Sequence, residues 1–256
     1  MLSRTFMTSD PEAKEAPSGV QDELVPERVV DGLPTMYCFE TCPFCFKIKA
    51  LLGSRGIEFS KVEVDPTFKT QLKWSDWGKV PVFVDVDGTQ VNDSNHILHY
   101  IDSKGTGAFP RMGEDPEQDK WMDFSNNVLG KSIVAVIYTS YRTSVQALDY
   151  VTRVDKFSFG SRLINKWLGG FIMRMVGKSR AKMFERPPRE NLKHQLDLMS
   201  EGIRGDFFGE KEPNGADFAN FGILRSMQGL NGFDIVESHH SVSVWYARMQ
   251  QNSGVF

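Results

Sequence analysis

The sequence predicts an α/β domain with the element order β-α-β-α-β-β-α, followed by an all-helical domain. Three observations predict this fold class. A Cys-x-x-Cys motif, Cys42–Cys45, stands between a short apolar run and a helical pattern. A Val-Pro pair, Val80–Pro81, opens a later strand of alternating character. From about residue 116 onward the apolar residues recur only at helical spacing.

Size and composition exclude several classes of protein. A chain of 256 residues is long enough for two packed domains. Its formal net charge of -3 gives no global attraction to nucleic acid, and we expect no nucleic-acid partner. No stretch reaches the roughly 18 apolar residues that a transmembrane helix needs. Three cysteines are too few for a disulfide-stapled secreted domain, which indicates a reducing compartment, cytoplasmic or mitochondrial.

The first elements of the α/β domain follow a polar segment. Residues 1–33 are acidic and lack periodicity, so we expect an N-terminal arm. Regular structure should begin with a strand at Thr35–Phe39. Pro43 suits the first turn of a helix, and Gly53 lies near the end of that helix. The alternation in Ile57–Val64 predicts a second, half-buried strand.

The remaining elements of this domain are a short helical piece, a hairpin and a helix. The helical piece runs through Trp74, and Val80–Val86 is the third strand. Asp87–Gly88 forms the hairpin turn into Thr89–Val91. Asp93 or Ser94 then caps a helix. We place the domain at residues 34–104.

A linker at 105–115, which contains glycine and proline, separates this domain from the helical domain, placed at 116–252. Asn214 and Asp217 form a capping-box pattern before an apolar run. Helices are expected at 116–139, 143–155, 159–182, 188–206, 215–230 and 240–251.

The Cys-x-x-Cys motif is the strongest chemical signal. Cys42 should lie at a helix N-terminus, where free N–H groups and the helix dipole favour the reactive thiolate. Cys42 and Cys45 are therefore the candidate catalytic residues. A zinc half-site would need a second pair of ligands, which the sequence does not offer at a suitable spacing. Two buried structural cysteines remain an alternative.

Two further pairs fit the binding of a peptide-like ligand. Proline at the start of a central strand removes a ladder donor. A cis Val80–Pro81 bond would turn the backbone N–H and C=O of Val80 toward an extended peptide. Asp93 and Ser94 either cap a helix and nothing more, or also receive the charged end of such a ligand.

The segment 156–193 carries ten Lys and Arg residues against two acids. Its simplest interpretation is a solvated helix face. Trp167 and Phe171 lie among these charges, so the segment could instead bind an anionic amphiphile or lie on a membrane surface.

Taken together, these motifs resemble the glutathione-transferase superfamily and, within it, the prostaglandin E synthase type 2 group. The resemblance runs from about Thr35 to Met249. It rests on both halves of the chain: Thr41–Cys45, Lys79–Val82, Val91–Ser94, Tyr141–Thr143, Ala147–Tyr150, Pro213–Asp217, Gly222–Arg225 and Trp245–Tyr246.

The resemblance implies a thioredoxin-like or glutaredoxin-like glutathione-binding domain, followed by a glutathione-transferase C-terminal-like helical domain. It implies glutathione as cofactor and the isomerisation of prostaglandin H2 to E2, or a related reaction on a hydrophobic oxidised substrate. Haem binds together with glutathione in some members. Cys42 would be the catalytic thiol and Phe44 would line the pocket. Val80 and Pro81 would contact the glutathione backbone, and Asp93 with Ser94 would hold its γ-glutamyl end.

One departure keeps other functions open. Relatives usually have a tyrosine three positions before the first cysteine, and this sequence has Phe39. One alternative is a non-catalytic subunit or adaptor of a larger complex, which could be mitochondrial. Another is a glutaredoxin-like oxidoreductase that uses Cys42 and Cys45 as a dithiol. Homodimers are common in the superfamily, but the sequence shows no self-complementary patch.

Overall fold

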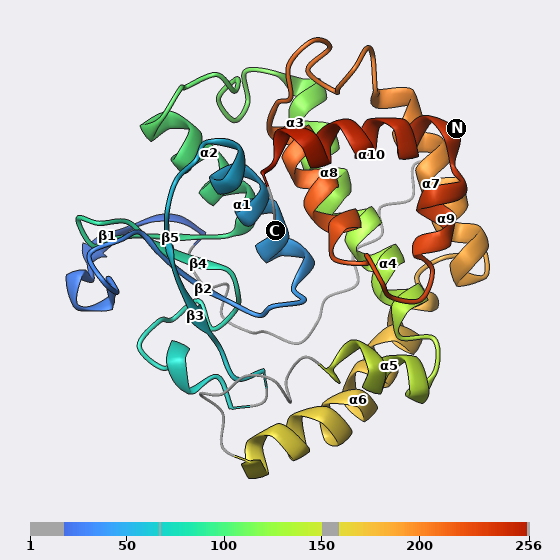
Figure 1. Ribbon diagram of the computed structural model, residues 1–256, viewed down its shortest axis with the longest axis horizontal. Coiled ribbons are helices and arrows are strands. Elements are labelled where there is room, and N and C mark those ends of the chain that lie inside the picture. The colour runs from blue at the N-terminus through green and yellow to red at the C-terminus, as the bar shows by residue number, and fades with distance from the viewer. Residues whose placement is uncertain (1–17, 67, 150–158, 255–256) are drawn as a thin grey trace, which may run out of the picture.

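The computed structural model describes residues 18–66, 68–149 and 159–254. Figure 1 shows a sheet on one side of the molecule and a group of helices on the other, with α1 between them. The thioredoxin-like sheet domain and the helical C-terminal region that the sequence predicts are both confirmed. Among the described helices, none is long and apolar enough to cross a membrane.

Five strands form one sheet in the order β1-β5-β4-β2-β3. β2 and β3 are parallel, whereas the other neighbours are antiparallel. The Val-Pro pair therefore leads into β4, the middle strand, as expected. The strands are β1 (Gly19–Leu24), β2 (Thr35–Cys38), β3 (Ser60–Glu63), β4 (Val82–Val84) and β5 (Thr89–Asn92).

The prediction of an arm without regular structure before Thr35 was wrong for its described part. β1 pairs with β5, with Gly19 opposite Asn92 and Val20 opposite Val91. The strand was missed because its sequence, GVQDEL, has no apolar alternation, and all but one of its residues keep contact with solvent. Residues 1–17 of the predicted arm lie outside the described part of the chain.

The two faces of the sheet are covered differently. α1 (Pro43–Ser54) and α2 (Ser94–Lys104) pack on the face that carries Met36 and Phe83. The opposite face, with Tyr37 and Val82, packs against Leu72 and two tryptophans.

Leu72 belongs to a 3-10 turn, Thr70–Leu72, and not to the second α-helix of the predicted order. Pro66 and the left-handed backbone of Lys69 (φ 46°) precede this turn. Neither fits the interior of an α-helix, so a longer helix cannot form here.

The helical half differs from the prediction mainly at helix ends. Residues 116–139 form α3 (Pro116–Phe124), a π turn (Ser125–Leu129) and α4 (Gly130–Ile137) in succession. The helix predicted at 143–155 begins earlier and ends at Ala147, and residues 150–155 lie outside the described part. α9 was not predicted. The other helices are α5 (Tyr141–Ala147), α6 (Phe159–Ala181), α7 (Pro188–Gly202), α8 (Gly215–Arg225), α9 (Phe233–Ser238) and α10 (His240–Asn252).

The predicted capping box at the start of α8 is confirmed. The Asn214 side chain accepts from the backbone N–H groups of Ala216 and Asp217, and the Asp217 carboxylate accepts from the N–H of Asn214. This reciprocal arrangement satisfies N–H groups that a helix start leaves without partners.

The sheet domain and the helical half join where α1 packs on α8. Gly222 of α8 approaches the backbone of Lys47 so closely that a Cβ there would lie 2.3 Å from the Lys47 nitrogen. The Lys47 side chain is buried and donates to Ser125 Oγ (2.7 Å), Asn126 Oδ1 and Asn95 Oδ1 (3.4 Å). Burial lowers the pKa of Lys47 to about 7, although the nearby Asp93 carboxylate opposes this shift.

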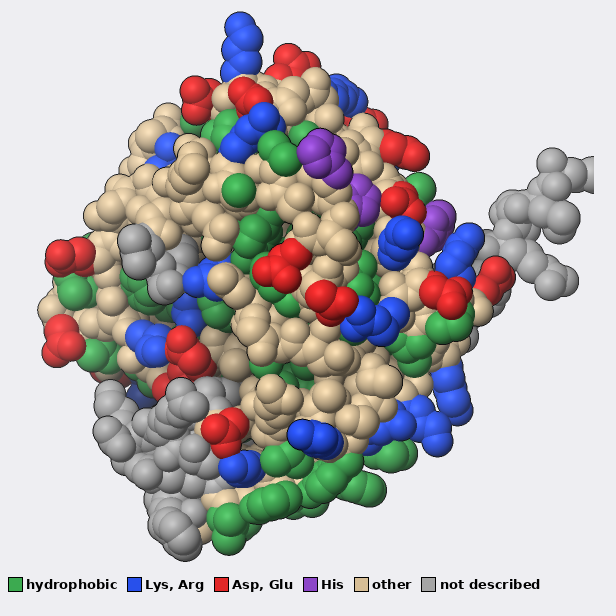
Figure 2. Space-filling view, turned by 45° about the vertical axis from the view of Figure 1, so that its right-hand side comes forward, with side chains coloured by type: hydrophobic (Ala, Val, Ile, Leu, Met, Phe, Trp, Pro, Cys, Tyr) green, Lys and Arg blue, Asp and Glu red, His purple; other side chains and the backbone are tan. Residues whose placement is uncertain are grey.

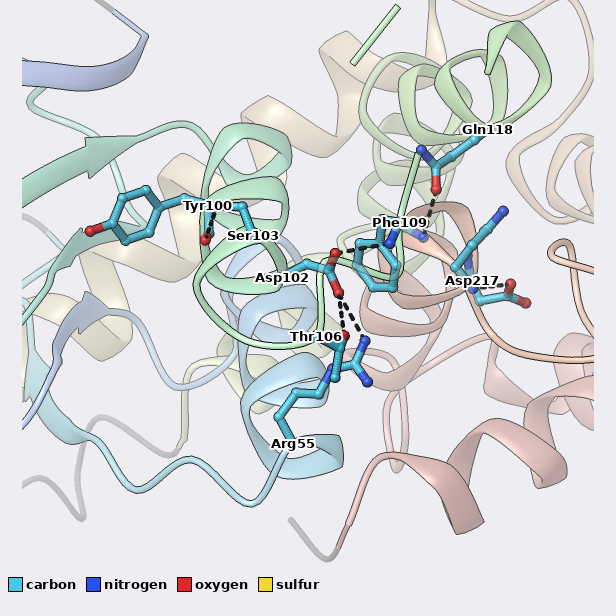
Figure 3. A network of polar contacts seen from close by, with 10 residues as sticks. Arg55, Tyr100, Asp102, Ser103, Thr106, Phe109, Gln118 and Asp217 are labelled. Atoms are coloured by element: carbon cyan, nitrogen blue, oxygen red, sulfur yellow. Dashed lines mark hydrogen bonds and ion pairs between the residues drawn. The ribbon is translucent and has the colours of Figure 1, made fainter. Parts of the chain in front are cut away.

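The predicted linker is held to both halves by hydrogen bonds (Figure 3). Asp102, at the end of α2, pairs with Arg55 at 2.9 Å and accepts from the Thr106 hydroxyl and the Phe109 backbone N–H. Gln118 of α3 donates to the Pro110 carbonyl oxygen and accepts from the N–H of Gly215 in α8. The helical half is thus tied to the sheet domain on this side as well.

Candidate active site

A cavity of about 760 Å³ lies between the sheet domain and the helices. The sheet domain contributes the motif residues and the loop before β4, and the helical half contributes residues of α4 and α6 and of the segments that follow α3 and α5. Six of the seven predicted site residues line this cavity: Cys42, Phe44, Val80, Pro81, Asp93 and Ser94. Cys45, the seventh, is completely buried beside Cys42.

Cys42 is the N-cap residue of α1, and Pro43 occupies the first helical position, as the sequence predicts. The hydrogen bond from the Cys45 thiol is the main cause that lowers the pKa of Cys42. Burial opposes this, and the backbone N–H groups of Cys45 and Phe44 add to the lowering. Burial and the neighbouring Cys42 sulfur raise the pKa of Cys45 well above its ordinary value. This ordering of pKa values makes Cys42 the candidate nucleophile of the pair, with Cys45 as the donor to its thiolate.

The Val80–Pro81 peptide bond is cis, as the sequence suggested. Both residues lie at the cavity wall immediately before β4. Lys69, Trp77 and Lys79 line the cavity on the same side.

Asp93 serves as a helix cap and also faces the cavity. Its carboxylate accepts from the backbone N–H of Asn95 at 2.9 Å and pairs with His96 Nδ1 at 3.5 Å. Burial raises its pKa, but the nearby His96 ring and the hydrogen bond from the Asn95 N–H outweigh this and leave the pKa below its ordinary value. Asp93 has a left-handed backbone (φ 72°), a conformation that costs energy in a residue other than glycine. Both alternatives for Asp93–Ser94, a cap and a ligand contact, are compatible with this geometry.

Tyr138 is a site residue that the sequence did not reveal. It lies at the end of α4, lines the cavity, and has a pKa raised to about 12 by burial and by negative charge at Cys42. A neutral phenol close to a thiolate can donate a hydrogen bond or a proton. Phe39, where relatives carry a tyrosine, also lines the cavity. Tyr138 adds a tyrosine to the lining of the same cavity from the other half of the chain.

The cavity offers little to a metal or to haem iron. Within the described residues, no group of three or more His, Cys, Asp or Glu side chains could hold a metal ion. None of the described cavity-lining residues is a histidine, and the one cysteine among them, Cys42, is the candidate catalytic thiol. The residues present therefore do not fit haem by themselves, and no step below involves it.

The fold and this cavity define a protein of the glutathione-transferase type, and comparisons with known proteins agree. Residues 41–104 match the glutathione S-transferase N-terminal domain family. The chain is 30% identical over 266 residues to prostaglandin E synthase 2 of Danio rerio, covering 85% of this chain and 70% of that protein. It is 26% identical to prostaglandin E synthase 2 of Mus musculus, over 85% and 69%. The chain belongs to the prostaglandin E synthase type 2 group of the glutathione-transferase superfamily.

Solved structures support the same fold. A glutathione S-transferase from Xanthobacter autotrophicus superimposes with a TM-score of 0.55 at 20% identity, over 87% of this chain and 95% of that one. Glutaredoxin 2 from Salmonella typhimurium, in complex with glutathione, has a TM-score of 0.51 at 16% identity, over 86% and 94%. At these identities the likeness shows the arrangement of elements and nothing finer.

Proposed function

We propose that this protein is a glutathione-dependent thiol enzyme that acts on a hydrophobic oxidised substrate. The observation that carries the proposal is the position of Cys42, a thiol with a lowered pKa at a helix N-terminus, at the wall of a large cavity. A purely structural cysteine pair would not need a cavity of this size. A zinc site would need ligands that the described residues do not supply.

Glutathione fits the half of the cavity formed by the sheet domain. Its extended backbone would lie along Val80 and Pro81, and its γ-glutamyl end would reach Asp93 and Ser94 at the start of α2. The ionised Asp93 carboxylate suits the γ-glutamyl ammonium group, and the Ser94 hydroxyl and the N–H groups of the helix suit its carboxylate. In this orientation the glutathione thiol would lie near Cys42.

The other half of the cavity is largely apolar and would hold the substrate. Val134, Leu148, Ile172 and Met173 contribute to this wall. A hydrophobic oxidised molecule would place its reactive oxygen atoms toward Cys42 and Tyr138 while its hydrocarbon part remains against α4 and α6.

For an endoperoxide such as prostaglandin H2, the reaction can be written as an isomerisation. A thiolate, of Cys42 or of bound glutathione, attacks one peroxide oxygen, so an S–O bond forms and the O–O bond breaks. The released alkoxide takes a proton, for which the donor we propose is the neutral phenol of Tyr138 at the cavity wall. A base then removes the proton from the carbon that bears the S–O oxygen. A carbonyl forms, the S–O electron pair returns to sulfur, and the thiolate is regenerated.

Calorimetry with glutathione tests the binding half of this proposal. We expect saturable binding, and we expect Ser94→Ala and Asp93→Asn each to weaken it about tenfold by removing a charge-assisted hydrogen bond. Ser103→Ala is the matched control, because Ser103 is exposed at the far end of the same helix and bonds only its own turn. The absence of binding at millimolar glutathione would instead favour a non-catalytic subunit of a larger complex.

Replacing Tyr138 with phenylalanine tests the proposed proton donor. The change removes only a hydroxyl, so the fold and glutathione affinity should stay close to those of the wild type. We expect kcat to fall on the order of a hundredfold while KM changes little, because general acid catalysis acts in the transition state. An unchanged kcat in steady-state assays with an endoperoxide would rule out this role for Tyr138.

The contact between Cys42 and Cys45 supports a second candidate function. Two adjacent thiols, one with a lowered and one with a raised pKa, are the arrangement used in dithiol exchange. In a glutaredoxin-like oxidoreductase the Cys42 thiolate would attack a substrate disulfide, release one thiolate and form a mixed disulfide with the other half. Cys45 would then attack the Cys42 sulfur, form the Cys42–Cys45 disulfide and release the reduced substrate thiol. The two mechanisms differ in their need for Cys45.

A further inference from the structure

α6 carries a continuous row of apolar side chains that are about half exposed. Phe171 is 57% exposed, Leu163 51% and Trp167 49%, and these residues follow one another at intervals of four. Successive positions four apart lie on one face of a helix. We call the exposed residues Leu163, Trp167, Leu168, Phe171, Ile172 and Met175 the α6 apolar face.

The opposite side of α6 is packed tightly against the rest of the molecule. A Cβ at Gly170 would lie 2.7 Å from a Val145 methyl carbon, and one at Gly177 would lie 2.7 Å from the Tyr138 carbonyl oxygen. Glycine at these two positions lets α6 approach α5 and the end of α4 closely. The close packing of α6 on α5 and on the end of α4 therefore leaves the α6 apolar face directed away from these helices.

The charge of α6 is of one sign. The helix contains five Lys and Arg residues and no Asp or Glu between Phe159 and Ala181. Figure 2 shows hydrophobic side chains gathered along the lower edge of the molecule, where α6 lies in Figure 1, with Lys and Arg side chains just above them. An apolar face bordered by cations is complementary to a surface of anionic headgroups over hydrocarbon. A second copy of the same helix would bring like charges together.

We propose that the α6 apolar face rests on an anionic lipid surface, with its aromatic and aliphatic side chains at the headgroup boundary and the flanking cations on the lipid phosphates. Trp167 and Phe171 suit this boundary because their rings are large and apolar. Lys178, which is exposed near the end of the helix, supplies one of the cations.

This contact would also place the cavity beside the lipid. Gly169, Ile172 and Met173 of the same helix line the cavity, and Ile172 belongs to both surfaces. A hydrophobic substrate dissolved in the bilayer could enter along α6 without crossing water. The delivery of substrate rests on the proposed function, whereas the lipid contact itself does not.

Cosedimentation of the full chain with vesicles tests the contact. We expect binding to mixed phosphatidylcholine–phosphatidylserine vesicles, weak binding to pure phosphatidylcholine, and loss of binding at high salt, which screens the headgroup attraction. Phe171→Glu and Trp167→Glu should each reduce the partition coefficient about tenfold or more. Val244→Glu is the matched control, because Val244 is a comparably exposed apolar residue (40%) on α10, away from this face.

Two measurements keep the result interpretable. Phe171→Glu and Trp167→Glu should both unfold at the wild-type temperature. If the wild-type protein binds glutathione, both variants should bind it with the same affinity, because Trp167 and Phe171 lie outside the cavity. Failure of the wild type to bind the anionic vesicles at low salt would overturn the proposal. A second result would also overturn the proposal: light scattering shows a dimer that Phe171→Glu dissociates, while vesicle binding stays unchanged. The α6 apolar face would then be an interface between two copies of the chain.

Discussion

Replacing Cys42 with serine should reduce turnover on the order of a thousandfold, because a hydroxyl is a far weaker nucleophile than a thiolate at neutral pH. The expected loss follows from the lowered pKa of Cys42, which the Cys45 thiol and the first N–H groups of α1 produce. Steady-state assays with glutathione and an endoperoxide or peroxide substrate measure it. Full activity in Cys42→Ser would assign the chemistry to glutathione alone.

The same ordering of pKa values predicts how the thiols react. The rate at which iodoacetamide alkylates Cys42 should reach half its maximum at a pH below 9, because the pKa of this thiol lies below that of an ordinary cysteine. Cys38 should stay unmodified under these conditions, since burial raises its pKa to about 12. Peptide mass spectrometry across a pH series distinguishes the sites. Cys38→Ser is the matched control in the activity assay and should leave turnover unchanged.

Cys45→Ser separates the two proposed functions. An isomerase that uses one thiolate needs Cys45 only as a hydrogen-bond donor, which serine can replace in part, so most activity should remain. A dithiol oxidoreductase needs the second sulfur to release its mixed disulfide, and should lose disulfide reduction entirely. We expect the first result with an isomerase substrate. Retained isomerase activity together with lost disulfide reduction would show that both activities share the site.

Gly222→Ala should destabilise the protein by about 3 kcal/mol or more, the largest effect on stability that we expect from one methyl group. The added Cβ would lie 2.3 Å from the Lys47 nitrogen and 2.8 Å from the Phe46 carbonyl carbon. These are backbone atoms of α1, so no side-chain rotation can make room, and α1 and α8 would have to separate. Urea unfolding measured by circular dichroism gives the difference.

Gly160→Ala is the control for this prediction. No atom of the described residues lies within 4 Å of a Cβ placed at Gly160 in the first turn of α6. Alanine also favours the helix over glycine, so stability should stay within about 0.5 kcal/mol of the wild type or rise slightly. Equal stabilities of the two variants would contradict the close backbone packing between α1 and α8.

Local interactions explain which features the sequence predicted correctly. The start of α1 at Pro43, the cap at Asp93 and the capping box of Asn214 with Asp217 each involve residues two or three positions apart. The strands β4 and β5 and the turn between them are similarly close in sequence. Because these interactions need no distant partner, residue type and spacing were enough to place them.

Pairings between distant segments were not predictable in the same way. β1 exists because it pairs with β5, and nothing within Gly19–Leu24 indicates that partner. The end of the helix predicted through residue 206 falls at Gly202, where a Cβ would lie 2.3 Å from the Trp121 ring. For β1 a pairing with a remote segment decided the structure, and the fit of Gly202 against a ring of α3 is likewise not contained in the local sequence.

The sequence by itself determined that Cys42 stands at the start of α1, that Val80–Pro81 leads into a strand and that Asp93 caps α2. Each of these is a short motif that depends on its own helix or strand. Only the tertiary structure decided that Tyr138 shares the cavity with Cys42, that Lys47 is buried between the two halves, and that one side of α6 lines the cavity while the other is exposed. Each of these depends on how the helices pack on the sheet domain. The packing of helices on a sheet depends on the shapes and the burial of side chains from distant parts of the chain. A local sequence pattern does not contain this information.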